Sequence, residues 1–159
     1  MKKIVIIIIS IIALLIIAGA GVFMFLNKEK ESITAREFKN IMEDKGYTIV
    51  NAKEQFAEMD YIEKVYLALE YEEYQIEFYE TSDDAGAIYL YNYNKALAEG
   101  QKKGTSVGTT LQGKNYSEYT LTMDGKYKYI SRINNTMVYL NVEEEYKDEV
   151  KEIIKELGY

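Results

Sequence analysis

The chain of 159 residues contains no cysteine, no histidine, no proline and no tryptophan. Without cysteine there is no disulfide, no thiolate nucleophile and no zinc–sulfur site. Without histidine there is no imidazole base, no ordinary Ser-His-Asp triad and no histidine ligand for a metal. No recognisable catalytic motif replaces them. The sequence therefore predicts a protein that is not an enzyme, and it offers no catalytic, cofactor-binding or metal-binding residue and no cofactor.

Charge is absent from residues 4–26, a run of 23 residues in which Ser10 carries the one hydroxyl group. A helix of this length spans about 34 Å, which is enough to cross a bilayer core of roughly 30 Å. We therefore predict a single-pass transmembrane helix at 4–26, behind a short tail at 1–3. A charged stem over 27–33 then leads to one domain over 34–159.

The alternative for the same segment is a cleavable signal peptide, which would make the protein secreted. Lys2 and Lys3 suit its positive start, and the Ala-Gly-Ala at 18–20 suits its cleavage site. The apolar run continues through residues 22–26 to full spanning length, which favours an uncleaved signal-anchor.

The orientation of the chain depends on two opposing signals. Five basic residues between Lys28 and Lys45 favour a cytoplasmic C-terminal side. Long domains, however, are translocated largely regardless of charge, and a Lys-Lys start is usual for signal sequences that leave the following chain outside. We expect the domain to be extracytoplasmic, with the cell membrane as its location.

The domain is acidic. The whole chain has 19 Lys and Arg against 26 Asp and Glu, and Lys2 and Lys3 lie before the apolar run, so residues 27–159 carry a net charge of −9. An acidic surface is repelled by phosphate backbones, which makes nucleic acid an unsuitable ligand. The abundance of Ile, Lys, Glu, Asn and Tyr is typical of AT-rich bacterial genomes, and we expect a bacterial source.

Helical signals mark three segments. Residues 34–45 begin with a capping box of Thr34 and Glu37, and Gly46 ends the segment in a left-handed cap. Residues 82–103 form a second helix, with Ile88, Tyr89, Tyr93, Ala96 and Leu97 as its expected inward side. Residues 143–158 form the last helix, whose inward side is expected to consist of Tyr146, Val150, Ile153, Ile154 and Leu157. Its Gly-Tyr ending repeats that of the first helix.

Alternating apolar and polar residues predict seven strands. The strand-like runs are 47–51, 61–70, 74–79, 105–111, 116–123, 127–133 and 136–142. The turn at residues 71–73 joins two of them into a hairpin with one buried face, and Asp124-Gly125 is a strong hairpin signal. The fold class is therefore α+β, with a mainly antiparallel sheet and about three helices behind the transmembrane helix.

An aromatic surface is the candidate interaction site. All 16 tyrosines follow residue 46. If the second and last helices cover one face of the sheet, polar residues and several tyrosines remain on the other face: Tyr66, Tyr79, Tyr127 and Tyr129. The alternative is that tyrosine is ordinary strand composition, because its ring fits a half-buried pleated surface.

Two hypotheses about function follow. The first is a membrane-anchored extracytoplasmic binding or accessory module, with an unknown protein or envelope partner. The second is a cell-envelope hydrolase that uses carboxylates, drawn from a cluster that includes Glu70, Glu73, Glu77 and Glu80. A pocket holding two facing carboxylates, one of them desolvated, would favour the hydrolase.

Overall fold

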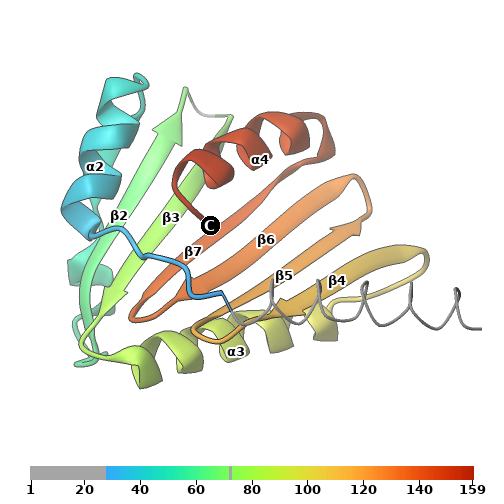
Figure 1. Cartoon of the computed structure of the whole chain (residues 1–159). Coiled ribbons are helices and arrows are strands. Elements are labelled where there is room, and N and C mark those ends of the chain that lie inside the picture. The colour runs from blue at the N-terminus through green and yellow to red at the C-terminus, as the bar shows by residue number, and fades with distance from the viewer. Residues whose placement is uncertain (1–27, 72) are drawn as a thin grey trace, which may run out of the picture.

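The computed structural model describes residues 28–71 and 73–159, which form a seven-stranded sheet with three α-helices (Figure 1). Every strand pairing in the sheet is antiparallel, which confirms the predicted α+β domain with a mainly antiparallel sheet. The helices are α2 (Ala35–Asp44), α3 (Asp84–Gly100) and α4 (Lys147–Glu156). The strands are β1 (Thr48–Asn51), β2 (Ile62–Glu70), β3 (Tyr74–Thr81), β4 (Ser106–Gln112), β5 (Tyr116–Met123), β6 (Lys126–Ile133) and β7 (Thr136–Glu143).

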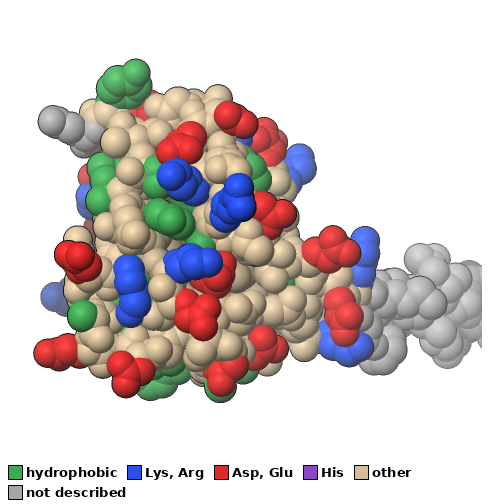
Figure 2. Space-filling model, turned by 90° about the vertical axis from the view of Figure 1, so that its left-hand side faces the viewer, with side chains coloured by type: hydrophobic (Ala, Val, Ile, Leu, Met, Phe, Trp, Pro, Cys, Tyr) green, Lys and Arg blue, Asp and Glu red, His purple; other side chains and the backbone are tan. Residues whose placement is uncertain are grey.

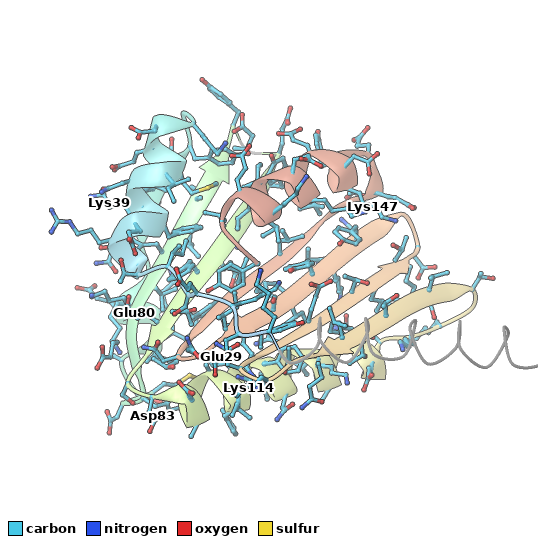
Figure 3. All side chains as sticks on the ribbon, viewed as in Figure 1. Glu29, Lys39, Glu80, Asp83, Lys114 and Lys147 are labelled. Carbon is cyan, nitrogen blue, oxygen red and sulfur yellow. The ribbon has the colours of Figure 1, made fainter. Side chains whose placement is uncertain are left out.

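The predicted transmembrane helix at 4–26 lies outside the described residues. Among the residues that are described, no helix is both long enough and apolar enough to cross a membrane. The described part of the stem lies against the domain. The Lys30 amide donates to Asn115 Oδ1 at 3.0 Å, and Asn115 Nδ2 donates back to the Lys30 carbonyl at 2.8 Å. Figure 3 shows Glu29 and Lys114 side by side, and they form an ion pair of 2.7 Å.

The strand order in the sheet is β1-β2-β3-β7-β6-β5-β4. Two antiparallel groups, β1–β3 and β4–β7, are therefore joined where β3 pairs with β7. Helix α3 connects β3 to β4 and so carries the chain from the middle of the sheet to its far edge. Strands β1 and β4 are the two edges.

The predicted capping box of α2 and the predicted Gly-Tyr endings of α2 and α4 are confirmed, whereas α4 begins at Lys147, after a 3-10 turn at Glu144–Tyr146, and not at residue 143. Thr34 Oγ1 accepts from the Glu37 amide, and the Glu37 carboxylate accepts from the Thr34 amide at 2.8 Å, which completes the capping box. At the other end Gly46 has φ +94°, and the Tyr47 amide donates to the Met42 carbonyl at 3.0 Å. Gly158 and Tyr159 repeat this arrangement at the end of α4.

The helices cover both faces of the sheet, so the prediction that the second and last helices share one face is wrong. Figure 1 shows α2 and α4 on the near face and α3 on the other side. The reason lies in the strands, which are apolar on both faces. Phe78 and Leu140 pack with α2 and α4, whereas Ile130 and Leu121 pack with α3.

The predicted inward side of α3 is also wrong. Tyr89, Tyr93 and Leu97 are 58%, 54% and 49% exposed. The buried side of this helix consists instead of Gly86, Ala87, Leu90, Tyr91 and Ala98. Because apolar residues lie on both the buried and the exposed side of α3, its sequence pattern does not mark one face clearly. The predicted inward side of α4 is confirmed, with Val150, Ile153 and Ile154 buried.

Candidate functional site

The four tyrosines expected to share a surface do not form one. Tyr79 packs on the α3 face of the sheet, whereas Tyr66, Tyr127 and Tyr129 lie on the face of α2 and α4. Tyr79, Tyr127 and Tyr129 are 6%, 3% and 4% exposed, and Tyr66 is half-buried. Odd and even strand positions point to opposite faces, and helices cover both faces, so these rings became part of the core.

Tyr127 and Tyr129 nevertheless lie at the floor of a groove. Helix α4 packs over the middle of the sheet (Figure 1), and a groove lies beside it over the same face of β4, β5 and β6. The resulting groove has a volume of about 420 Å³. We call it the α4 groove. Its lining is Val107, Thr109, Glu118, Thr120, Thr122, Tyr127, Tyr129, Lys147, Lys151, Ile154, Lys155 and Tyr159.

One wall of the α4 groove is basic. Lys147, Lys151 and Lys155 are spaced four residues apart, so they lie on one side of α4 in successive turns. Lys147, labelled where α4 begins in Figure 3, donates to Thr122 Oγ1 at 3.3 Å, and its ammonium lies 5.2 Å from the centre of the Tyr127 ring. Lys147 also pairs with Glu144 at 3.9 Å and Lys155 with Glu152 at 3.6 Å, whereas Lys151 makes no ion pair within the described part of the chain.

The basic wall differs from the rest of the surface. Figure 2 shows the side of the molecule that carries α2, where basic and acidic side chains are intermingled. Lys39 there pairs with Glu43 across one turn of α2. The lining of the α4 groove includes three lysines and one carboxylate, that of Glu118. The groove is therefore a locally basic region in a chain of net charge −7.

The floor of the α4 groove supplies hydroxyl groups and Glu118. Tyr129 donates to Glu118 Oε2 at 3.3 Å. Burial, reinforced by the negative charge of Glu118, raises the pKa of Tyr127 to about 12 and that of Tyr129 further. Both phenols therefore stay neutral at physiological pH and serve as hydrogen-bonding groups. Thr109, Thr120 and Thr122 add three aliphatic hydroxyls along the strands.

A second hollow lies on the opposite face of the sheet. Its volume is about 460 Å³, and Leu69, Gln75, Glu77, Tyr139 and Asn141 contribute to its lining. Tyr79 reaches its edge and donates to the Glu77 carboxylate. Burial, followed by the charge of Glu77, raises the pKa of Tyr139. Like the α4 groove, this hollow contains one carboxylate.

A metal centre finds no support in the described part of the chain, where no group of three or more acidic side chains is arranged to hold an ion. Comparisons with family models, with curated proteins and with solved structures find no significant match. The chemistry of the α4 groove is therefore the basis for assigning a function.

Sequence reasoning missed the lysine wall, although its signal was present. The spacing of Lys147, Lys151 and Lys155 places them on one side of a helix whose inward face was predicted correctly. What the sequence did not show is that the neighbouring face of β4 and β5 would be left open beside this helix.

Proposed function

We propose that the protein is a membrane-anchored extracytoplasmic binding module whose α4 groove holds a segment of an anionic polysaccharide. The proposal of an anchor rests on the uncharged run at 4–26. The proposal of an external domain rests on the Lys-Lys start before that run, since long domains are translocated largely regardless of charge. The observation that carries the binding site is the basic wall of Lys147, Lys151 and Lys155 above an open, hydroxyl-lined floor.

The ligand class follows from the groups that face the groove. Three ammonium groups in successive turns suit acidic groups repeated along an extended chain. The hydroxyls of Thr109, Thr120 and Thr122 suit the hydroxyl groups of sugars, which both donate and accept hydrogen bonds. The carboxylate of Glu118 is an acceptor for two such hydroxyls. A polysaccharide with one acidic group per sugar presents both kinds of partner at once.

The alternative function is a hydrolase that uses two carboxylates. Such an enzyme needs a pair at a fixed separation, with one carboxyl group kept protonated by an apolar environment. The α4 groove holds Glu118 and the hollow on the opposite face holds Glu77, one carboxylate in each. This distribution favours binding over hydrolysis as the function to test first.

Binding is tested with fluorescently labelled hexagalacturonate and the full chain in mild detergent. We expect saturable binding that weakens as salt is added, because its main contacts are charged. Lys151→Glu should weaken binding about tenfold, as should Lys155→Glu. Fully methyl-esterified hexagalacturonate, which lacks the charges, should bind at least as weakly as the variants.

The matched control is Lys39→Glu, which makes the same charge change on the exposed surface of α2. It should bind hexagalacturonate as the unmodified chain does. An equal loss in Lys39→Glu and Lys151→Glu would mean that the net charge of the protein, rather than the groove, attracts the ligand, and the assignment of the α4 groove would then be wrong.

The anchor is tested independently of the groove. The protein should remain in the membrane fraction after washing with high salt and with alkali, and an external protease should digest the domain on intact protoplasts. Release by salt alone would contradict an integral anchor, and protection from the protease until lysis would contradict the external location.

A further inference from the structure

Strand β4 is an unprotected edge of the sheet. Within the described residues it pairs with β5 over seven consecutive positions and with no strand on its other side. Its side chains are mostly exposed, and Val107 is 69% exposed. The outer side of β4 therefore presents a row of backbone N–H and C=O groups to solvent, which is a template for one more strand.

The features that usually protect an edge strand are missing from β4. Its sequence, SVGTTLQ, has no charge and no proline, and its register with β5 contains no bulge. The opposite edge, β1, is four residues long and next to α2, so it offers a much shorter template. The two edges of the same sheet are thus unequal, and β4 is the one open to strand addition.

The charge around β4 points to the kind of strand that fits. Residues 101–117 contain Lys102, Lys103 and Lys114 and no carboxylate, in a chain whose net charge is −7, and Lys114 is paired with Glu29. On the α3 face, the Lys102 ammonium lies 5.6 Å from the centre of the Tyr119 ring. A Cβ placed on Gly108 would be 3.4 Å from Lys102 Nζ, so this charge lies directly over the middle of β4.

The other face of the same edge carries two apolar side chains, with Thr109 between them. Val107 and Leu111 alternate with Gly108 and Thr110 along β4, and Leu111 packs against the core beneath α4. A strand beside β4 would lie about 4.8 Å away, within reach of side chains on both faces. Its residues on the α4 side would meet Val107 and Leu111, and those on the α3 side would meet Lys102.

We propose that β4 binds an extended segment of a partner protein in which apolar and acidic residues alternate. The apolar side chains pack on Val107 and Leu111, and the acidic ones face Lys102 on the α3 side. The backbone hydrogen bonds of the added strand provide affinity, and the two unlike faces of the edge fix its register. This site borders the α4 groove at Val107 and uses none of the three lysines of its basic wall.

The test uses the full chain in mild detergent and a synthetic capped peptide of sequence Val-Glu-Val-Glu-Val-Glu-Val. We expect the peptide to bind and to slow amide hydrogen exchange over residues 106–112. Its Val-Lys counterpart should bind at least about tenfold more weakly, as should the acidic peptide with proline at its centre. Equal binding of all three peptides would overturn the proposal.

Variants of the chain locate the site. Val107→Lys places a charge on the edge and should weaken binding of the acidic peptide about tenfold. Val50→Lys, the matched change on edge strand β1, should leave it unchanged. Lys102→Glu should reverse the preference, so that the Val-Lys peptide binds more tightly than the Val-Glu peptide. This reversal separates a charge contact from a loss of folding.

Three further outcomes are decisive. Equal weakening by Val50→Lys and Val107→Lys would show that β4 is not the site. Concentration-dependent dimerisation of the full chain that Val107→Lys abolishes would assign the edge to a second copy and overturn the proposal of a separate partner. Lys151→Glu should leave peptide binding intact, so the peptide site and the polysaccharide site can fail independently of each other.

Discussion

Helices α3 and α4 cover opposite faces of one sheet, and their outer surfaces are very different. The outer side of α4 carries charged residues of both signs, from Lys147 to Glu156. The outer side of α3 carries Tyr89, Tyr93 and Leu97, with Glu99 near its end. The ring of Tyr89 stacks on that of Tyr93 at 6.4 Å and meets the ring of Tyr61 at 5.7 Å.

The comparison shows when the sequence pattern of a helix identifies its buried side. In α4 the apolar residues are confined to one stripe, so periodicity alone identified the buried side. In α3 the buried side includes Gly86, Ala87 and Ala98, because the helix packs closely on the sheet. A Cβ on Gly86 would be 3.0 Å from Thr81 Cβ. The larger apolar residues are left outside, and periodicity identified the wrong side.

The largest expected effect comes from removing a leucine from each side of α3. Leu90 is 5% exposed and Leu97 is 49% exposed. Leu90→Ala should lower the free energy of unfolding by about 3 kcal/mol, because it leaves a cavity in the core. Leu97→Ala should lower it by roughly 0.5 kcal/mol. Urea unfolding of the two variants measures the difference, and a larger loss for Leu97→Ala would restore the inward side first predicted from the sequence.

The second prediction concerns alkaline pH, at which buried tyrosines on the two faces of the sheet should affect stability in the same way. Burial raises the pKa of Tyr91, on the buried side of α3, and of Tyr127, on β6 beside α4, to about 12. These pKa values exceed the value of about 10 for tyrosine in the unfolded chain. The two phenols therefore keep their protons up to a higher pH in the folded state. The stability that results is complete below about pH 10 and is lost as the pH rises towards 12.

In Tyr91→Phe and in Tyr127→Phe the free energy of unfolding should fall less steeply as the pH rises. The free energy of unfolding falls by up to about 1.4 kcal/mol per pH unit for each tyrosine that titrates only after unfolding. Urea unfolding between pH 9 and about pH 12 measures the slope. Tyr89→Phe controls for the removal of a phenol from the outer surface. Unchanged slopes in both core variants would show that other tyrosines dominate the alkaline transition.

The smallest expected effects are those of two glycine substitutions, and they should have opposite signs. Gly158, after α4, has φ +85°, so Gly158→Ala should destabilise the domain by about 1 kcal/mol. Gly100 lies in the last turn of α3, and a Cβ there would meet nothing within 4 Å. Gly100→Ala should therefore stabilise the domain by roughly 0.5 kcal/mol. Thermal unfolding measures both, and shifts of the same sign would contradict the difference between the two helix ends.

The sequence was sufficient to predict the strands, their turns and two of the helix ends, because these depend on local chemistry. It was not sufficient to predict on which face of the sheet the apolar side chains of each strand lie. In the hairpin Glu70 pairs with Tyr74, so Ala68 rather than Leu67 or Leu69 shares a face with Ile76. The alternating patterns of β2 and β3 were read as one buried face, although this register places them on opposite faces.

The same difficulty limited the prediction of the candidate site. Tyr127 and Tyr129 were expected on an open face, and they do border the α4 groove, but as a buried floor. The basic wall depends on where α4 crosses the sheet, which is set by the position of β7 between β3 and β6. That neighbour relation joins residues far apart in the chain, and no local pattern specifies it.

The central position of β7 has a consequence for how the domain folds. Residues 76–80 of β3 cannot complete their pairing until residues 136–140 are available, so the ladder that unites the two groups of strands closes a loop over residues 81–135, a little under half of the domain. Such closure is slow because its entropic cost comes before its contacts are gained. During synthesis, β1–β3 should therefore wait as a separate three-stranded unit with one edge of β3 unpaired, and assembly of the complete sheet should be the rate-limiting event.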